Sequence, residues 1–119
     1  MIETKKQITL ITEAIQEKKG QNIVIVDLTT IDDTICEYMV ICEGSSPNQV
    51  RAVAESVGDS LRINANERPI HVAGVENAEW VAMDYSDITV HIFLPESRTF
   101  YNLETLWADA KLTHLPAID

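Results

Sequence analysis

Residues 39–57, MVICEGSSPNQVRAVAESV, pass from a short apolar run through a polar turn into a helix, and they decide the fold class. The apolar part belongs to the run CEYMVICE, residues 36–43, which is typical of a strand covered on both faces. The helix is predicted by apolar residues at the spacing i, i+3, i+4, i+7 and i+11, namely Val50, Val53, Ala54, Val57 and Leu61. A strand that leads directly into such a helix predicts an α/β layered protein.

The turn within this stretch, GSSPNQV at residues 44–50, has some features of a phosphate-binding turn, because backbone N–H groups at the start of a helix attract anions. A P-loop, however, requires a lysine followed by Ser or Thr, and a dinucleotide-binding turn requires G-x-G-x-x-G; this stretch contains neither. Ser46 is a good N-cap, Pro47 suits the first helical position, and Gln49 completes an S-x-x-Q capping box. Helix capping therefore explains these residues.

Further helices and strands are predicted on both sides of this unit. A first helix runs from Ile8 to Gly20, because Ile8, Ile11 and Ile15 recur at i, i+3 and i+7. Strands are predicted at residues 22–28 (NIVIVDL), 36–43 and 69–74 (PIHVAG), and a hairpin with its turn at Tyr85 and Ser86 is predicted within residues 79–94. A short final helix is predicted by the periodic apolar residues Phe100, Leu103, Leu106 and Trp107. The order α-β-β-α-β-β-β-α predicts one α/β domain over residues 1–119, with a mixed sheet of about five strands and helices packed on it.

The composition limits the partners and the location of the protein. Nine Lys and Arg residues against nineteen Asp and Glu residues give a net charge of −10, which disfavours direct nucleic-acid binding and suits either a basic partner or simple solubility. Cys36 and Cys42 are six residues apart, so along a strand they would face the same side too far apart to pair. Without a signal peptide or a long apolar run, a reduced and cytoplasmic protein with no membrane contact is expected.

No catalytic or metal site is evident in the sequence. In nucleotidyltransferases a Gly-Ser turn is followed by carboxylates on a strand, whereas Glu55 and Asp59 belong to the periodic helix. Asp84 and Asp87 in DYSD are typical turn residues, although two carboxylates can also hold Mg²⁺. The three histidines lack ligand spacing. We therefore expect no enzyme and no cofactor, with a nucleotide-binding or nucleotidyltransferase-type enzyme that uses the GSS turn with Asp84 and Asp87 as the alternative.

The hairpin at residues 79–94 carries the most unusual surface. With the turn at Tyr85 and Ser86, Asp84 is expected opposite Asp87, and Trp80 opposite His91. One face is then almost wholly apolar and belongs to the core, whereas the other combines two aromatic residues with small and acidic ones: Trp80, Ala82, Asp84, Asp87, Thr89, His91 and Phe93. This second face suits a basic partner, or it is covered by the final helix. In that helix Phe100, Leu103 and Leu106 are expected to pack inward and Tyr101 to be exposed.

Three segments together resemble one family over nearly the whole chain: MVICEGSSPNQVRAVAESV, EWVAMDYSDITVHIFLPESRTFYNLETLW (residues 79–107) and the ADA that follows. They are similar to the ribosomal silencing factor, or Iojap-like, family. The resemblance implies a nucleotidyltransferase-like fold without known catalysis. It also implies docking on the large ribosomal subunit, on a basic protein of the intersubunit face (number fourteen of the large-subunit set). A member bound there blocks joining of the small subunit and represses translation when nutrients are scarce.

The same resemblance implies a set of partner-binding residues. From the segments WVAMDYSD and ESRTFYNLE these are Trp80, Asp84, Tyr85, Asp87, Arg98 and Tyr101. Strand alternation, by contrast, places Tyr85 on the core side unless the turn exposes it. A homodimer formed through the apolar residues of the hairpin face is a further possibility.

Overall fold

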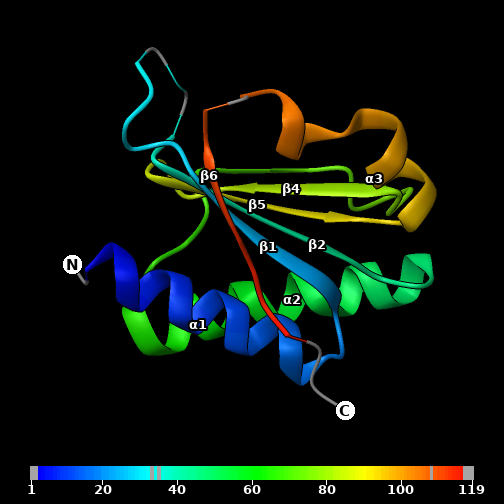
Figure 1. Ribbon diagram of the computed structural model, residues 1–119. Coiled ribbons are helices and arrows are strands. Elements are labelled where there is room, and N and C mark those ends of the chain that lie inside the picture. The colour runs from blue at the N-terminus through cyan, green and yellow to red at the C-terminus, as the bar shows by residue number, and fades with distance from the viewer. Residues whose placement is uncertain (1–2, 33, 35, 108, 117–119) are drawn as a thin grey trace.

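A computed structural model describes residues 3–32, 34, 36–107 and 109–116 of the chain. Its sheet has six strands in the order β3-β4-β5-β2-β1-β6, and helices lie on both of its faces (Figure 1). The elements follow one another as α1 (Thr4–Glu17), β1 (Gln21–Asp27), β2 (Tyr38–Glu43), α2 (Pro47–Ala65), β3 (His71–Ala73), β4 (Trp80–Asp84), β5 (Ile88–Phe93), α3 (Pro95–Tyr101), the 3₁₀ helix η1 (Leu103–Thr105) and β6 (Lys111–His114). The α/β fold with a mixed sheet is therefore confirmed.

The sheet is mixed because one central pair of strands, β2 and β5, runs parallel, whereas every other pair of neighbouring strands runs antiparallel. Parallel strands need a long crossover connection, and here the crossover contains α2.

Strand β2 leads into α2 as the sequence predicts. Ser46 caps the helix, since its hydroxyl accepts a hydrogen bond from the Gln49 N–H at 3.1 Å. The Gln49 side chain accepts from Ser45 and donates to the carbonyl groups of Lys18 and Lys19, which ties the start of α2 to the end of α1.

Two apolar clusters lie on opposite faces of the sheet. The helix-side core joins α1 and α2 to the sheet through buried residues that include Ile11, Ile15, Val53, Val57, Leu61, Val81, Val90 and Ile92. The outer cluster lies on the face that α3 crosses, and it contains Val24, Val26, Leu28, Cys36, Met39, Ile41 and Phe93, with Trp80, Leu103 and Trp107 packed against it. Figure 1 shows α1 and α2 below the sheet and α3 above it. The prediction that one face of the hairpin belongs to the helix-side core and the other to the opposite side of the sheet is thus confirmed.

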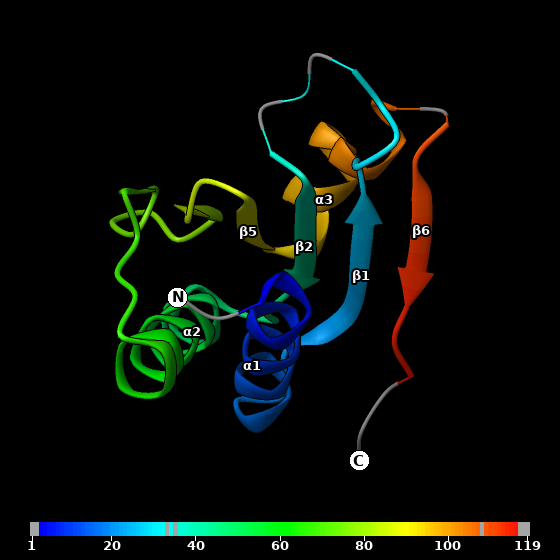
Figure 2. The ribbon, with the colours of Figure 1, turned by 90° about the vertical axis from the view of Figure 1, so that its left-hand side faces the viewer.

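The expectation of about five strands misses β6 at the edge of the sheet. Residues 111–114 pair antiparallel with β1, from Val24 opposite His114 to Asp27 opposite Lys111, and Figure 2 shows β6 beside β1. The segment KLTH is short and exposed along its whole length, so it lacks the apolar pattern of a buried strand. Its pairing depends on the otherwise free edge of β1, which the local sequence does not reveal.

The hairpin register also differs from the expectation. Asp84 lies opposite Thr89 and Trp80 opposite Phe93, two residues away from the predicted partners. The turn falls at Ser86 and Asp87, because Ser86 adopts a left-handed backbone (φ 75°) and its N–H donates to the Asp84 carboxylate at 2.8 Å. A shift of two residues keeps every side chain on its face, so only the cross-strand partners change.

The final helix ends earlier than predicted, and this changes which of its residues are buried. Asn102 adopts a left-handed backbone (φ 47°) and separates α3 from η1. Phe100 and Leu106 are consequently 80% and 60% exposed, so the expectation that they pack inward is wrong, whereas Leu103 does reach the outer cluster.

The expectation that the two cysteines face the same side of the sheet is also wrong. Both are free and buried, but Cys42 lies in the helix-side core and Cys36 in the outer cluster. The reason is that Cys36 precedes β2, so strand alternation does not apply to it.

Candidate functional site

An aromatic pair on the outer face, Trp80 and Tyr101, forms the centre of the candidate site. The Trp80 ring on β4 stacks on Phe93, with ring centroids 5.1 Å apart, and Tyr101 at the end of α3 packs on Trp80 at 4.7 Å. Phe93 is fully buried, Trp80 is half-buried and Tyr101 is 48% exposed. The end of the final helix therefore covers Trp80 only in part. A shallow depression of about 190 Å³ remains beside the pair, lined by Gly74, Asn77, Glu79, Trp80 and Tyr101.

A chain of polar contacts among buried side chains holds Trp80 in place. Its indole Nε1–H donates to Nδ1 of His91 at 3.0 Å, and Nε2 of His91 lies 3.1 Å from the Thr89 hydroxyl. The Thr89 hydroxyl lies 3.5 Å from the Cys36 sulfur. Burial lowers the pKa of His91 to about 4, so its ring is neutral at physiological pH. The sequence predicts His91 and Thr89 on this face, with His91 directly opposite Trp80; the structure makes His91 a diagonal neighbour of Trp80 and shows the hydrogen bond between them.

Acidic residues lie at both ends of the β4–β5 hairpin, and Glu79 lines the depression beside the aromatic pair. Asp84 and Asp87 lie at the hairpin turn, where Asp84 is partly buried and Asp87 is exposed. Residues 69–110, which form β3, β4, β5, α3 and η1, contain seven acidic residues and a single Lys or Arg, Arg98. Because Arg98 is only 8% exposed, its charge contributes little to the surface. This side of the molecule therefore presents exposed aromatic groups in a negative field.

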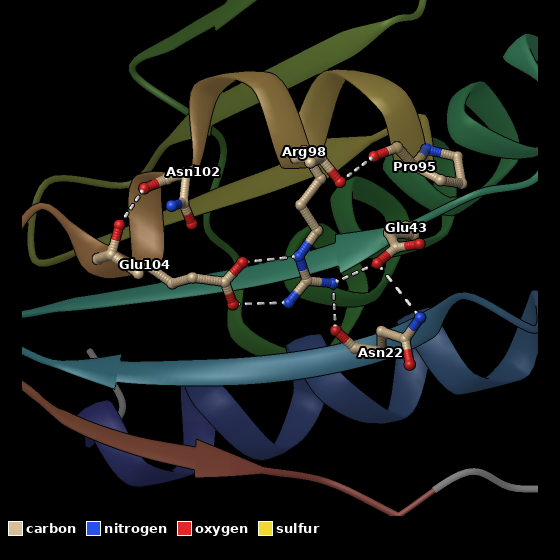
Figure 3. A network of polar contacts seen from close by, with 8 residues as sticks. Asn22, Glu43, Pro95, Arg98, Asn102 and Glu104 are labelled. Carbon is tan, nitrogen blue, oxygen red and sulfur yellow. Dashed lines mark hydrogen bonds and ion pairs between the residues drawn. The ribbon is translucent and has the colours of Figure 1, made fainter.

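Arg98 is a structural residue within the chain. Its guanidinium group binds Glu104 through two hydrogen bonds of 2.9 Å, and it also reaches Glu43 of β2 at 2.9 Å and the Asn22 carbonyl oxygen of β1 (Figure 3). Burial alone would lower the pKa of Arg98, but the hydrogen bonds and charges of Glu104 and Glu43 raise it. The hydrogen bonds from Arg98 in turn lower the pKa of Glu104. Arg98 thus fastens α3 and η1 to the sheet, and its side chain is occupied inside the molecule.

Tyr85 differs from the other candidate residues in its burial. Its side chain is 8% exposed and belongs to the helix-side core, as strand alternation indicates. Burial raises the pKa of Tyr85 to about 12. The six candidate residues therefore fall into three groups: the aromatic pair and the acidic turn lie at the outer surface, Arg98 anchors the helix beside them, and Tyr85 faces the opposite layer.

The structure does not bring together the residues of the alternative nucleotide site. The Asp87 carbonyl oxygen accepts a hydrogen bond from Glu37, just before β2 begins, whereas the Gly44 N–H donates to Phe93 at the end of β5. Since β2 and β5 are parallel and six residues long, the GSS turn and the two aspartates lie at opposite ends of the sheet, roughly 20 Å apart. The structure therefore does not gather the GSS turn and the two aspartates into one compact site.

Within the described residues, no group of three or more His, Cys, Asp or Glu side chains is arranged to hold a metal ion. Over the same part of the chain, no helix has both the length and the apolar character needed to cross a membrane.

The fold and this surface define a mixed α/β protein whose most distinctive feature is an aromatic and acidic patch on one sheet face. Residues 1–119 match the family described as "Ribosomal silencing factor during starvation". The chain is 35% identical over 114 residues to ribosomal silencing factor RsfS of Bacillus subtilis, which covers 93% of this chain and 92% of that protein. A crystal structure of a protein from Chromobacterium violaceum superposes with a TM-score of 0.85 at 32% identity, over 98% of this chain and 96% of the other.

Two more distant relatives come from organelles. The chloroplastic protein Iojap of Arabidopsis thaliana is 35% identical over 84 residues, which cover 69% of this chain and 34% of that protein. A mouse protein named "Mitochondrial assembly of ribosomal large subunit protein 1" is 22% identical over 108 residues, which cover 89% of this chain and 47% of the other. The chain therefore belongs to the ribosomal silencing factor family, whose members are ribosome-associated regulators that repress translation.

Proposed function

We propose that this chain docks on the large ribosomal subunit through the aromatic pair Trp80 and Tyr101 and the acidic turn at Asp84 and Asp87, and thereby sterically blocks joining of the small subunit. The partner is a basic protein of the intersubunit face, number fourteen of the large-subunit set. The single observation that carries the proposal is the partly exposed stack of Trp80 and Tyr101 within a segment, residues 69–110, whose one Lys or Arg residue, Arg98, is buried. Bound in this way, the protein represses translation when nutrients are limiting.

Several chemical arguments support the proposed surface. Tryptophan and tyrosine are enriched among the residues that dominate binding energy, because they bury a large rigid area at little entropic cost. The carboxylates of Asp84 and Asp87, at the turn end of the same hairpin, attract a basic protein and repel exposed RNA phosphates. The mouse relative is named for the assembly of a large ribosomal subunit, which favours the large subunit over the small one.

Arg98 and Tyr85 have indirect roles in this proposal. Arg98 holds α3 on the sheet and so keeps Tyr101 beside Trp80, while its own guanidinium group is used within the chain. Tyr85 fills the helix-side core beneath the turn that carries Asp84 and Asp87. The direct contact surface therefore consists of Trp80, Tyr101, Asp84 and Asp87.

The test is sedimentation of purified ribosomal subunits on sucrose gradients with wild-type protein and with Trp80→Ala. Wild-type protein should migrate with the large subunit and reduce the fraction of assembled ribosomes. Trp80→Ala should bind at least about 30-fold more weakly, because truncation of a central aromatic residue costs about 2 kcal/mol or more. A matched control is Ile63→Ala, which removes an apolar side chain that is 68% exposed on α2, in the opposite layer.

The result can be read only for folded variants, so circular dichroism and thermal unfolding accompany the gradients. If Trp80→Ala proves unstable, Tyr101→Ala tests the same surface at a more exposed position. Normal co-sedimentation of a folded Trp80→Ala or Tyr101→Ala variant would contradict the proposed surface. Dimerisation of the free wild-type protein that is lost in the same variants would instead favour the homodimer. The cytoplasmic location expected from the sequence stays a prediction.

A further inference from the structure

Trp80 is the one aromatic residue of the proposed contact surface whose polar atom is bonded to a buried side chain. Its indole Nε1–H points back into the sheet and donates to Nδ1 of His91 at 3.0 Å. His91 is 9% exposed, and the bond to it leaves the flat apolar part of the indole ring for the outer surface and for Tyr101. The orientation of Trp80 therefore depends on a residue that a partner does not reach.

The geometry defines the protonation state of His91. An indole N–H can only donate, so Nδ1 of His91 must accept and carries no proton. In the neutral ring the proton is then on Nε2, which lies 3.1 Å from the Thr89 hydroxyl oxygen and can donate to it. Thr89 is 8% exposed and itself lies 3.5 Å from the Cys36 sulfur. The Thr89 hydroxyl therefore stabilises the tautomer that Trp80 needs.

The observed hairpin register makes this arrangement possible. Trp80 lies opposite Phe93, and Ala82 lies opposite His91, so Trp80 and His91 are diagonal neighbours on one face. The small side chain of Ala82 leaves room for the two rings, whose centroids are 5.9 Å apart. In addition, Phe93 stacks under the indole at an interplanar angle of 21°. The ring of Trp80 is thus fixed by one stacking contact and one hydrogen bond.

We propose that His91 is a positioning residue for docking: its unprotonated Nδ1, in the tautomer favoured by Thr89, holds the Trp80 indole in the orientation that the partner protein recognises. This inference rests on the proposed docking function and adds a buried residue that specifies how the surface is presented. A preorganised side chain binds better because less conformational freedom is lost on association. Without the acceptor, the indole can rotate away from Phe93 and Tyr101.

The first test concerns the free protein and needs no ribosome. Nuclear magnetic resonance of uniformly ¹⁵N-labelled protein should reveal a scalar coupling across the hydrogen bond between Trp80 Nε1 and His91 Nδ1. The His91 nitrogen shifts should show the proton on Nε2. Trp107→Phe assigns the two indole signals, because Trp80 and Trp107 are the two tryptophans of the chain. The absence of the coupling in folded protein, or a proton on Nδ1, would overturn the positioning role.

The second test compares two substitutions with the same number of side-chain heavy atoms and the same branching, His91→Asn and His91→Leu. Asparagine can present an oxygen near the position of Nδ1, whereas leucine presents no acceptor. His91→Leu should bind the large subunit about 3- to 10-fold more weakly than wild type, the effect of one lost hydrogen bond, and His91→Asn should stay within about twofold. Equal binding by folded His91→Leu and His91→Asn would contradict the inference.

The two tests separate failure of the inference from failure of the proposed function. If wild-type protein does not sediment with large subunits, the docking proposal fails and the docking part of this inference fails with it. If wild-type protein binds and Trp80→Ala does not, but His91→Leu binds normally, docking holds and the positioning role is overturned. If His91→Leu does not fold, the coupling measured in wild-type protein and the binding of His91→Asn decide.

Discussion

At the scale of single residues, the buried imidazole of His91 connects Trp80 to Thr89 on the outer face of the sheet. It accepts from Trp80, contacts Thr89 and is 9% exposed. Burial lowers the pKa of His91 to about 4 from the ordinary value of 6.5, because the charged ring would lose its hydration. A proton on Nδ1 would also face the N–H donor of Trp80.

This lowered pKa predicts an acid-sensitive stability. Below pH 6.5 the unfolded chain takes up a proton at His91 that the folded protein does not accept until about pH 4. The free energy of unfolding should therefore fall as the pH falls from about 6.5 to 4, by about 3 kcal/mol in total. Urea denaturation at a series of pH values measures this slope.

The control for this prediction is His91→Leu, which should lose most of the slope above about pH 4.5. Glu104, whose pKa is lowered from 4.5 by the hydrogen bonds from Arg98, contributes stability that is lost only at lower pH, so it does not obscure this window. An unchanged slope in the variant would show that other groups cause the acid sensitivity.

At the scale of elements, α3 illustrates how a short helix is kept in place by one buried cation. A seven-residue helix is marginal by itself, and α3 carries the exposed Phe100 and the half-exposed Tyr101 rather than a continuous apolar face. Arg98 compensates by joining α3 to β1 and β2 and to Glu104 in η1. Its three carboxylate contacts make the position of Tyr101 dependent on a polar network.

Arg98→Ala should therefore destabilise the protein and loosen the end of α3. Removing one member of a buried ion pair leaves the carboxylates of Glu43 and Glu104 without their partner, which costs about 3 kcal/mol. Chemical denaturation measures the loss. Arg62→Ala serves as the control, because the pair of Arg62 with Asp59 is half-exposed and should contribute less than about 0.5 kcal/mol. Similar losses in the two variants would show that the Arg98 network is not a special anchor.

At the scale of the whole molecule, charge is distributed unevenly along the chain. Residues 1–68, which contain α1, α2, β1 and β2, hold seven basic and eleven acidic residues, a net charge of −4. Residues 69–110, which contain β4 and α3, hold seven acidic residues and one basic residue, the buried Arg98, a net charge of −6. Such an asymmetry orients the protein as it approaches a basic surface.

The charge asymmetry predicts that Asp87→Lys slows association with the large subunit by about threefold or more, with less effect on dissociation. The difference from wild type should shrink as the salt concentration rises, because exposed charges are screened. Stopped-flow binding at low and at physiological ionic strength measures both effects. Glu55→Lys makes the same charge change at an exposed position of α2 in the opposite layer, and it should have a smaller effect. Equal effects of the two variants would mean that net charge, rather than its placement, controls association.

Much of the fold was accessible from the sequence because it rests on short-range patterns. The strand that precedes Gly44, the cap at Ser46 and the apolar stripe from Val50 to Leu61 involve residues only a few positions apart, and the structure confirms all three. Strand alternation also assigned both faces of the hairpin, since a register shift of two residues leaves the faces unchanged. Helix periodicity likewise predicts the exposure of Tyr101, which is 48% exposed, whereas the sequence leaves open whether the final helix covers Trp80.

The α/β class, the strand–turn–helix unit and the two sides of the hairpin can thus be predicted from the sequence, because helix capping and periodicity are local. How these parts meet can be seen only in the folded molecule. Arg98 bonds to residues 55 and 76 positions away, and β6 pairs with β1 across separations of 84 to 90 residues. Trp80 meets His91 as a diagonal neighbour rather than as the directly opposite residue that the sequence predicts. Such contacts depend on chain segments brought together by burial of a common core, so local patterns cannot specify them.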